Sequence, residues 1–298
     1  KLMKEDGFDL WSRVHKRYSA GNINLPLFYY RRHGDNLTGN KQRIFSARRQ
    51  IKKDAVIKQL ENCRPVIAVI PCRENFDFKN NLWNAKINGK SLLARDIEVC
   101  LNSKFMDYIV VTCDNPAAED VVKQYDDPRL QFKLRSLRST VRNASIVDTI
   151  KNCALPFDPE LKGITVLRYI QTPFVTTDVL EEAITSLVMN HADSSWGVEP
   201  IKRKLFRRNS HGLEILSKEG RFSSDFDLIY GDSQTFSATR NNCIARGTLN
   251  GAAAVCFEVS STESFYIKSE LELFIARTLA DYDEKGIWSD RNNRCSKD

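Results

Sequence analysis

The sequence predicts an α/β fold with a mainly parallel sheet, and three observations support this prediction. From residue 63 onward, short apolar segments alternate with longer stretches in which apolar residues recur at helical spacing. Strands that alternate with such helices are typical of βαβ units, whose crossover connections are right-handed. The first apolar segment ends at a basic, polar loop, as strands of open parallel sheets do where they hold phosphates.

The expected elements follow one another in a regular order. The segments with the length and composition of strands are 66–70, 108–112, 164–170, 195–199 and 252–259. The segments with helical spacing are 44–60, 91–102, 116–125, 143–154, 177–190 and 269–279. The turn Asn88-Gly89-Lys90 precedes the second of these helices, and Glu119 and Asp120 place favourable negative charge in the first turn of the third.

Composition divides the chain into three parts. Residues 1–62 are basic and mostly helical, residues 63–285 carry the alternating strands and helices, and residues 286–298 form a polar tail. The chain is 42% hydrophobic and 28% charged, as expected of a globular protein. Its net charge of +7 suits an anionic small-molecule partner, and no nucleic-acid recognition motif is present. The chain begins at Lys1 without an initiator methionine, so we expect a fragment.

The cysteines and the apolar segments indicate a cytoplasmic protein. Eight cysteines are scattered without Cys-x-x-Cys pairs, and several lie in apolar segments, as Cys256 does. This pattern favours reduced, buried thiols over a disulfide framework or a zinc site. No apolar run approaches membrane-spanning length and no signal peptide is recognisable, so we expect no transmembrane segment.

The segment 66–92 carries the strongest functional signal. Its strand is followed by two cationic side chains, Arg73 and Lys79, and two amides, Asn80 and Asn81. A loop of this kind at the carboxyl end of a strand can hold phosphate groups. The alternative is an ordinary strand-to-helix connection that happens to be basic. The chain contains neither the P-loop motif G-x-x-x-x-G-K-[ST] nor the dinucleotide-binding motif G-x-G-x-x-G. The sequence therefore indicates neither of these two classes of nucleotide-binding protein.

Several short motifs occur in a specific order along the second part. They are Ile70-Pro71-Cys72-Arg73, Lys79-Asn80-Asn81-Leu82, Asn88-Gly89-Lys90-Ser91-Leu92, Asp114 after a strand, Ile170-Gln171-Thr172-Pro173, Asn250-Gly251-Ala252 and Ser269-Glu270-Leu271-Glu272. Through these motifs, residues 65–280 resemble the CMP-sialic acid synthetase (acylneuraminate cytidylyltransferase) family. The resemblance implies a three-layer, Rossmann-like nucleotidyltransferase fold of the nucleotide-diphospho-sugar transferase type.

The resemblance also implies an activity: transfer of CMP from CTP to an acidic sugar with release of pyrophosphate, in surface-glycan biosynthesis. Arg73 and Lys79 would be the catalytic, phosphate-binding cations, and the other nucleotide-binding residues would be Asn80, Asn81 and Asp114. The sugar side would be lined by Gln171 and Asn250. Magnesium would bridge phosphate oxygens, and a homodimer is one expected assembly because relatives of this fold often dimerise.

Two departures from the family pattern leave a second function open. The glycines of the family's phosphate loop are replaced by Glu74-Asn75-Phe76-Asp77-Phe78, whose carboxylates repel phosphate. Tyr266 and Lys268 stand where the family has the aspartates that hold magnesium. The alternative function is therefore a catalytically degenerate domain that binds a nucleotide or sugar, or that dimerises, within a larger family 2 glycosyltransferase.

The first part of the chain carries its own motifs. The acidic pair Glu5 and Asp6 precedes Phe8-Asp9-Leu10-Trp11, and Tyr30-Arg31-Arg32-His33 follows. With these motifs, residues 2–40 resemble the C-terminal part of family 2 glycosyltransferases. The resemblance implies that Glu5 and Asp6 supply a catalytic base, and the alternative is an acidic helix N-terminus. The nucleotide-binding strands of such an enzyme would precede Lys1.

Overall fold

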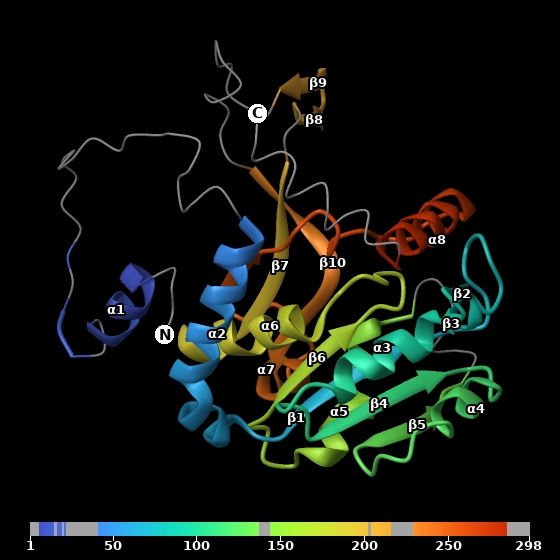
Figure 1. Ribbon diagram of the computed structural model, residues 1–298, viewed down its shortest axis with the longest axis horizontal. Coiled ribbons are helices and arrows are strands. Elements are labelled where there is room, and N and C mark those ends of the chain that lie inside the picture. The colour runs from blue at the N-terminus through green and yellow to red at the C-terminus, as the bar shows by residue number, and fades with distance from the viewer. Residues whose placement is uncertain are drawn as a thin grey trace.

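The computed structural model describes residues 6–14, 17–19, 21, 41–136, 144–201, 204–215 and 229–284. Its centre is a seven-stranded sheet with the order β11-β7-β10-β6-β1-β4-β5 (Figure 1). These strands are β1 (Val66–Pro71), β4 (Tyr108–Cys113), β5 (Leu130–Leu134), β6 (Ile164–Arg168), β7 (Ser194–Ile201), β10 (Ile229–Arg240) and β11 (Ala254–Glu258). Neighbouring strands run parallel except where β10 pairs with β6 and β7.

Helices cover both faces of the sheet. Successive side chains of a strand point to opposite faces, so each central strand contributes to two hydrophobic cores. Val66, Ala68 and Ile70 belong to a core shared with α3 (Leu92–Leu101), α4 (Ala118–Val122) and α6 (Thr177–Met189). Ile67 and Val69 belong to a second core, shared with α5 (Ile146–Ala154) and α7 (Asn241–Ala245). The predicted three-layer α/β fold with a mainly parallel sheet is confirmed.

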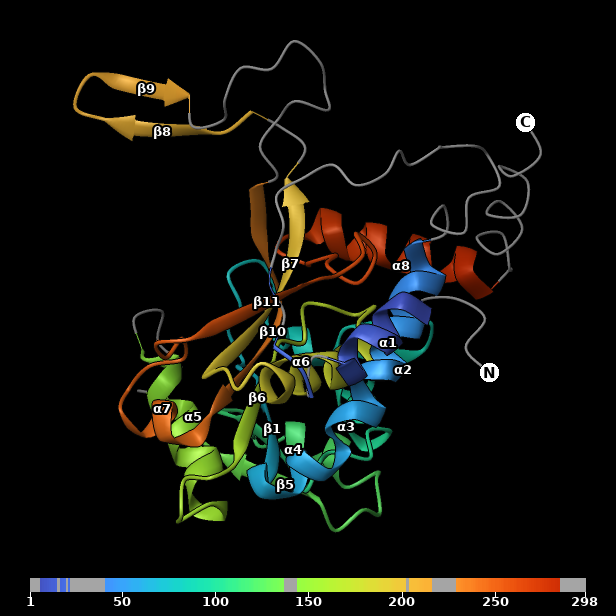
Figure 2. The same ribbon diagram turned by 90° about the vertical axis from the view of Figure 1, so that its left-hand side faces the viewer.

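Shorter elements complete the described chain. They are α1 (Asp6–Val14), η2 (Glu61–Cys63), η3 (Leu82–Asn84), β2 (Lys86–Ile87), β3 (Lys90–Ser91), η5 (Leu155–Phe157), β8 (Phe206–Asn209), β9 (Gly212–Ile215) and α8 (Glu270–Glu284). β8 and β9 form an antiparallel hairpin that projects away from the central sheet (Figure 2). No helix in the described ranges has both the length and the apolar character needed to cross a membrane.

Strand β10 was not predicted from the sequence, although it lies inside the sheet. Its buried positions include Ser233, Thr235, Ser237 and Thr239, so it lacks the apolar pattern of a buried strand. The structure satisfies these hydroxyls with hydrogen bonds; for example, Ser233 Oγ donates to the carbonyl of Gly197 at 2.7 Å. Buried polar side chains of this kind are tolerated because they have partners.

The helix α2 (Lys41–Leu60) packs on the α/β domain although it lies in the first part of the chain. It lies alongside α6 (Figure 1), and it buries Ile51, Val56 and Leu60. The predicted domain boundary at residue 62 stays a prediction, but the packing of α2 makes this helix a structural part of the domain that follows it.

The cysteines of the described residues are all free thiols, as predicted. Six of them are buried: Cys63, Cys72, Cys100, Cys113, Cys153 and Cys243. Cys256 is exposed, which corrects the expectation that it is buried. The reason is that β11 is an edge strand of the sheet, so only part of its surface is covered.

A buried ion pair joins the sheet to its helices. Arg168, at the carboxyl end of β6, is 0% exposed and pairs with Asp96 of α3. Its Nη1 atom also donates to Thr172 Oγ1 at 2.8 Å and to the carbonyl of Thr235 at 2.9 Å. Burial raises the pKa of Asp96 to about 6, because desolvation of the carboxylate outweighs the attraction of Arg168.

We predict that Asp96→Ala lowers the free energy of unfolding by about 3–5 kcal/mol, because it leaves the charge of Arg168 buried without its counter-ion. Urea denaturation measures this change. The matched control is Lys123→Ala, which removes a half-exposed ion pair with Glu119 and should cost less than about 1 kcal/mol. Equal losses in the two variants would contradict the prediction.

Candidate functional site

The topology of the sheet creates a crevice at one edge. From β1 the chain moves outward through β4 and β5, and it then returns to form β6 on the other side of β1. Adjacent strands whose connections leave in opposite directions open a crevice at their carboxyl ends, where α/β proteins bind ligands. The loop after β1 and the residues after β6 therefore lie at the edge where a ligand is expected.

The loop after β1 is held in shape by its own backbone and by the end of β4. The backbone N–H of Asn81 donates to the carbonyl of Glu74 at 2.6 Å, and Asn75 and Asn80 form an isolated β-bridge. Asp114 accepts the backbone N–H of Glu74 at 2.7 Å. These bonds close the loop over residues 74–81.

Asn81 also acts as a support of this loop. It adopts a left-handed backbone conformation with φ of 51°, which asparagine tolerates better than most residues. Its Oδ1 atom accepts from Asn115 Nδ2 at 3.0 Å and from Trp83 Nε1 at 3.2 Å. Asn81 and Asp114 were predicted to bind a nucleotide, and in the structure both position the loop.

The two predicted cations lie on the solvent side of this loop. Arg73 packs over the ring of Phe76, with 4.9 Å from Cζ to the ring centroid, and its Nη2 atom lies 3.4 Å from Asp77. Lys79 pairs with Glu270 at the start of α8, with 3.0 Å between Nζ and Oε1. Ion pairs at this exposure are weak, so a phosphate with several charges can compete for both cations.

A cationic pocket lies on the β4–β5 side of the loop. It has a volume of about 220 Å³ and is lined by Thr112, Lys133, Leu134, Arg135, Ser136, Thr149, Asn152 and Cys153. The backbone N–H of Arg135 donates to the carbonyl of Cys113 at 3.0 Å, which fixes this residue at the end of β5. Burial lowers the pKa of Arg135, with Asp114 opposing the shift; the guanidinium still carries its charge at neutral pH.

An aromatic pocket lies on the β6–β10 side. It has a volume of about 240 Å³ and is lined by Tyr169, Trp196, Asp232, Gln234, Phe236, Ser237 and Tyr266. Burial raises the pKa of Tyr169 to about 12, so its hydroxyl stays protonated at neutral pH and can donate a hydrogen bond. Aromatic faces with a few polar groups suit a small hydroxylated molecule. We call this the aromatic pocket below.

A β-bulge shapes the wall of the aromatic pocket. The pairing of β10 with β7 shifts between Asp232 and Ser237, and Gln234 within this stretch has φ of 53°. The backbone N–H of Gln234 donates to Asp232 Oδ1 at 2.9 Å. Bulges of this kind redirect side chains and occur often near functional sites. The aromatic pocket was not predicted from the sequence because β10, the strand that carries the bulge, was not predicted.

Two residues were predicted to line the sugar side of the site. Gln171 lies at the carboxyl edge of the sheet, and Asn250 does not. Gln171 lies two residues after Tyr169, and its carbonyl accepts the N–H of Ile267, next to Tyr266. Asn250 lies at the opposite edge, where its carbonyl accepts from the Oγ of Ser194, the first residue of β7. Asn250 is therefore not part of the candidate site.

The predicted glycosyltransferase base stays a prediction. Glu5 lies outside the described residues, and Asp6 is the first residue of α1, whose side chain is not described.

The described residues do not fit a magnesium site built from protein carboxylates. They contain no cluster of three or more histidine, cysteine, aspartate or glutamate side chains that could hold a metal ion. The carboxylates near the loop already have partners: Asp77 pairs with Arg73, Glu270 with Lys79, and Asp114 accepts the N–H of Glu74. Magnesium stays a prediction that rests on the family resemblance alone.

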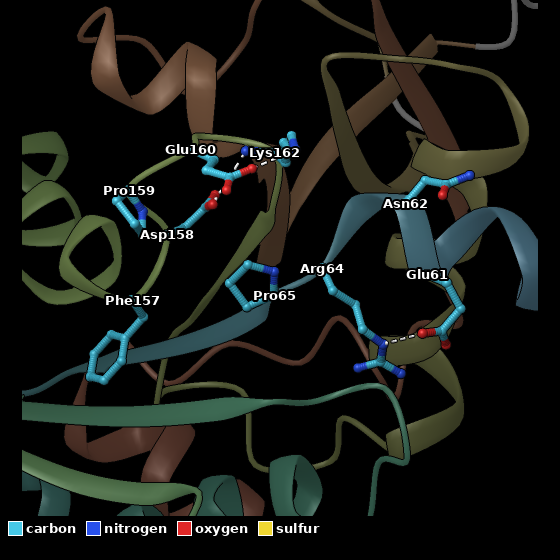
Figure 3. A pocket seen from close by; sticks show the side chains of 9 residues that line it. All are labelled: Glu61, Asn62, Arg64, Pro65, Phe157, Asp158, Pro159, Glu160 and Lys162. Carbon is cyan, nitrogen blue, oxygen red and sulfur yellow. Dashed lines mark hydrogen bonds and ion pairs between the residues drawn. The ribbon is translucent and has the colours of Figure 1, made fainter.

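A larger pocket, of about 640 Å³, lies at the opposite edge of the sheet, beside the start of β1 and β6. Figure 3 shows that its charged side chains pair with one another: Arg64 with Glu61, and Lys162 with Glu160. Asp158 accepts from Gly163 N and Asn241 Nδ2, both at 2.7 Å. Because the strands begin here and ligands of open α/β sheets bind at the carboxyl ends of the strands, this pocket is not the candidate site.

Comparison with known proteins shows the family of this chain. A family model described as Cytidylyltransferase matches residues 84–242, which is more than half of the chain. The chain belongs to the cytidylyltransferase family. The sialic acid subtype within this family stays a proposal. A comparison with curated proteins gave no match.

Solved structures resemble the fold of this chain. One is 4-diphosphocytidyl-2C-methyl-D-erythritol synthase from Anaerococcus prevotii DSM 20548, with 12% identity, a TM-score of 0.55, and coverage of 75% of this chain and 99% of the other. Another is CMP:2-keto-3-deoxy-manno-octonic acid synthetase complexed with CTP, with 14% identity, a TM-score of 0.54, and coverage of 74% and 100%. A further 4-diphosphocytidyl-2C-methyl-D-erythritol synthase has 14% identity, a TM-score of 0.52, and coverage of 72% and 99%. At these identities the likeness shows the shared fold.

We predict that Asp114→Ala weakens the binding of pyrophosphate by about tenfold, although it removes a negative charge from the edge of the site. The expected loss is that of one hydrogen bond to a backbone N–H that shapes the loop, about 1–3 kcal/mol. Isothermal titration calorimetry measures it. The control is Asp114→Asn, which keeps an acceptor oxygen and should retain binding; tighter binding by the alanine variant would refute the supporting role.

Proposed function

We propose that the domain transfers CMP from CTP to an acidic sugar and releases pyrophosphate, in the biosynthesis of a surface glycan. One observation carries this proposal: the basic loop on β1 lies between a cationic pocket and an aromatic pocket at the same edge of the sheet. In this order, the cationic pocket suits the nucleoside, the loop suits the phosphates and the aromatic pocket suits the acceptor.

Each part of the crevice has a role in the proposed reaction. Arg73 and Lys79 stabilise the charge on the triphosphate and on the departing pyrophosphate. The pocket around Arg135 takes the nucleoside part of CTP. In the aromatic pocket, the protonated hydroxyl of Tyr169 donates a hydrogen bond to the acceptor.

The bond changes follow from these roles. A hydroxyl oxygen of the acceptor attacks the α-phosphorus of CTP, and the bond from that phosphorus to the bridging oxygen breaks. The electron pair leaves with pyrophosphate, and Asp232, the carboxylate that lines the aromatic pocket, accepts the hydroxyl proton. Positioning and fixed charges supply the catalysis in reactions of this class.

A second candidate function is a binding domain without turnover, within a larger family 2 glycosyltransferase. It is favoured by the ion pairs Arg73–Asp77 and Lys79–Glu270, which neutralise both phosphate-binding cations. Tyr266 and Lys268 in place of the family's aspartates favour it as well. A cytoplasmic location and a homodimer stay predictions under either function.

The experiment is to follow pyrophosphate release from CTP with a panel of sugar acids that includes N-acetylneuraminic acid and 2-keto-3-deoxy-manno-octonic acid, with and without magnesium. We predict turnover with at least one acid, and a loss of about 100-fold in kcat/KM for Lys79→Ala because a fixed cation is removed from the phosphates. The matched control is Lys90→Ala, which removes a surface lysine paired with Glu98 and should leave turnover unchanged. Nucleotide binding that ignores magnesium, without turnover for any acid, would instead support the binding domain.

A further inference from the structure

The segment 259–268 connects β11 to α8 and carries Tyr266, one wall of the aromatic pocket. Three bonds fix this segment to the sheet and its loops. The N–H of Val259 donates to the carbonyl of Val198 at 2.9 Å, and Ser264 Oγ donates to Glu199 Oε2 at 2.6 Å. The N–H of Ile267, next to Tyr266, donates to the carbonyl of Gln171 at 2.9 Å. The pocket wall therefore depends on how this segment is held.

A fourth attachment comes from α2, more than 200 residues earlier in the chain. Arg49 of α2 approaches Glu263 with both terminal nitrogens, at 3.1 Å from Nη1 to Oε1 and 3.4 Å from Nη2 to Oε2. Glu263 Oε2 also accepts from the backbone N and the Oγ of Ser260, at 3.0 and 2.8 Å. The carboxylate of Glu263 thus joins α2 to the turn that leads to Tyr266.

Arg49 is anchored firmly enough to hold this turn. It is only 7% exposed, and its Nε atom donates to Glu182 of α6 at 2.6 Å. Burial alone would lower the pKa of Arg49, but Glu263 and Glu182 outweigh it and raise the pKa. A bidentate arginine fixes both the distance and the direction of its partner. Arg49 can therefore transmit the position of α2 to the segment.

Neighbouring lysines of α2 fasten the helix to α6 alone. Lys52 lies 2.8 Å from Glu182 Oε1, and Lys53 lies 2.6 Å from Glu181 Oε2 and 2.7 Å from Asp178 Oδ1. Their bonds end on α6 and not on the segment that carries Tyr266. The two lysines therefore attach α2 to α6, whereas Arg49 also attaches α2 to the segment that forms the pocket wall.

We infer that Arg49 is a positioning residue that ties the wall of the aromatic pocket to the N-terminal part of the chain. Through Glu263, the placement of α2 sets the placement of Tyr266, so the two parts of the chain share the acceptor side of the site. Only the identity of the pocket's ligand rests on the proposed function. The attachment of α2 to the pocket wall is shown by the contacts of Arg49 with Glu263 and Glu182.

Hydrogen exchange of the full chain, followed by mass spectrometry, tests the link without any ligand. We expect Arg49→Ala to increase exchange of the amides of 260–267 by about fivefold or more, while the amides of β1 and β4 keep their protection. The fold should survive because Glu182 keeps Lys52 and Glu263 keeps Ser260. The matched control, Lys53→Ala, removes ion pairs to Asp178 and Glu181 only. Arg49 keeps its bonds to Glu182 and Glu263 in this variant, so α2 stays in place and exchange of 260–267 should be unchanged.

A second variant removes the same interaction by changing Glu263, the partner of Arg49. Glu263→Gln keeps the shape of the side chain and removes its charge, so it should reproduce the exchange pattern of Arg49→Ala. The double variant should add little to either single change, because both remove one interaction. Arg49→Lys should restore part of the protection. If Arg49→Ala fails to fold, Glu263→Gln alone decides the question.

A kinetic measurement adds a functional readout. With CTP and the sugar acid of the panel that is turned over, Arg49→Ala should raise the KM of the sugar acid by about tenfold and leave the KM of CTP within about twofold. Unchanged exchange of 260–267 in both Arg49→Ala and Glu263→Gln, or an equal increase in Lys53→Ala, would overturn the inference. If the wild-type protein shows no turnover, the proposed function fails while the exchange results still decide the role of Arg49.

Discussion

The site depends on one buried ion pair, between Arg168 and Asp96. Arg168 binds α3 through Asp96, the loop before α6 through Thr172, and β10 through the carbonyl of Thr235. The next residue in the chain is Tyr169, and the residue after Thr235 is Phe236, so two walls of the aromatic pocket flank these contacts. An ion pair that is fully desolvated contributes little net stability, but it imposes one arrangement on the elements that it joins. The shape of the crevice follows from that arrangement.

Charge distribution distinguishes the two sides of the crevice. Lys133 and Arg135 line the pocket on the β4–β5 side, while Asp232 is the charged residue that lines the aromatic pocket among the described residues. The loop between them carries Arg73 and Lys79, each paired with a carboxylate. Anionic groups are therefore attracted to the loop and to the β4–β5 side, while the other side offers aromatic faces on which a ring can pack. This separation of chemistry suits a transferase that must orient two different molecules.

The sequence allowed the prediction of the parts of the fold whose signals are local. β1, β4 and β6 are short, apolar and buried on both faces, and their pattern is typical of central parallel strands. β10 was missed because its buried hydroxyls find partners only once the sheet is assembled. β5 was missed because it is an edge strand with exposed polar residues.

The same reasoning explains which site residues could be found. Arg73 and Lys79 were predicted correctly to lie on the loop after β1, because they follow the strand directly in the sequence. Asn250 was not brought to the site, since its motif precedes β11 and parallel strands begin at the opposite edge. The link from Arg49 to Glu263 could not be predicted, because it joins segments that only the packing of α2 on α6 brings together.

The reversed direction of β10 has a consequence for the diversity of this family. β7 ends at the carboxyl edge of the sheet and β10 begins there, so the two ends of their connection lie at the same edge as the candidate site. The hairpin of β8 and β9 occupies that connection and leaves every β-strand of the core in place. Evolution can lengthen, shorten or replace this insert without repacking the hydrophobic interior. The edge of the sheet that carries the aromatic pocket can thus vary while the core stays the same.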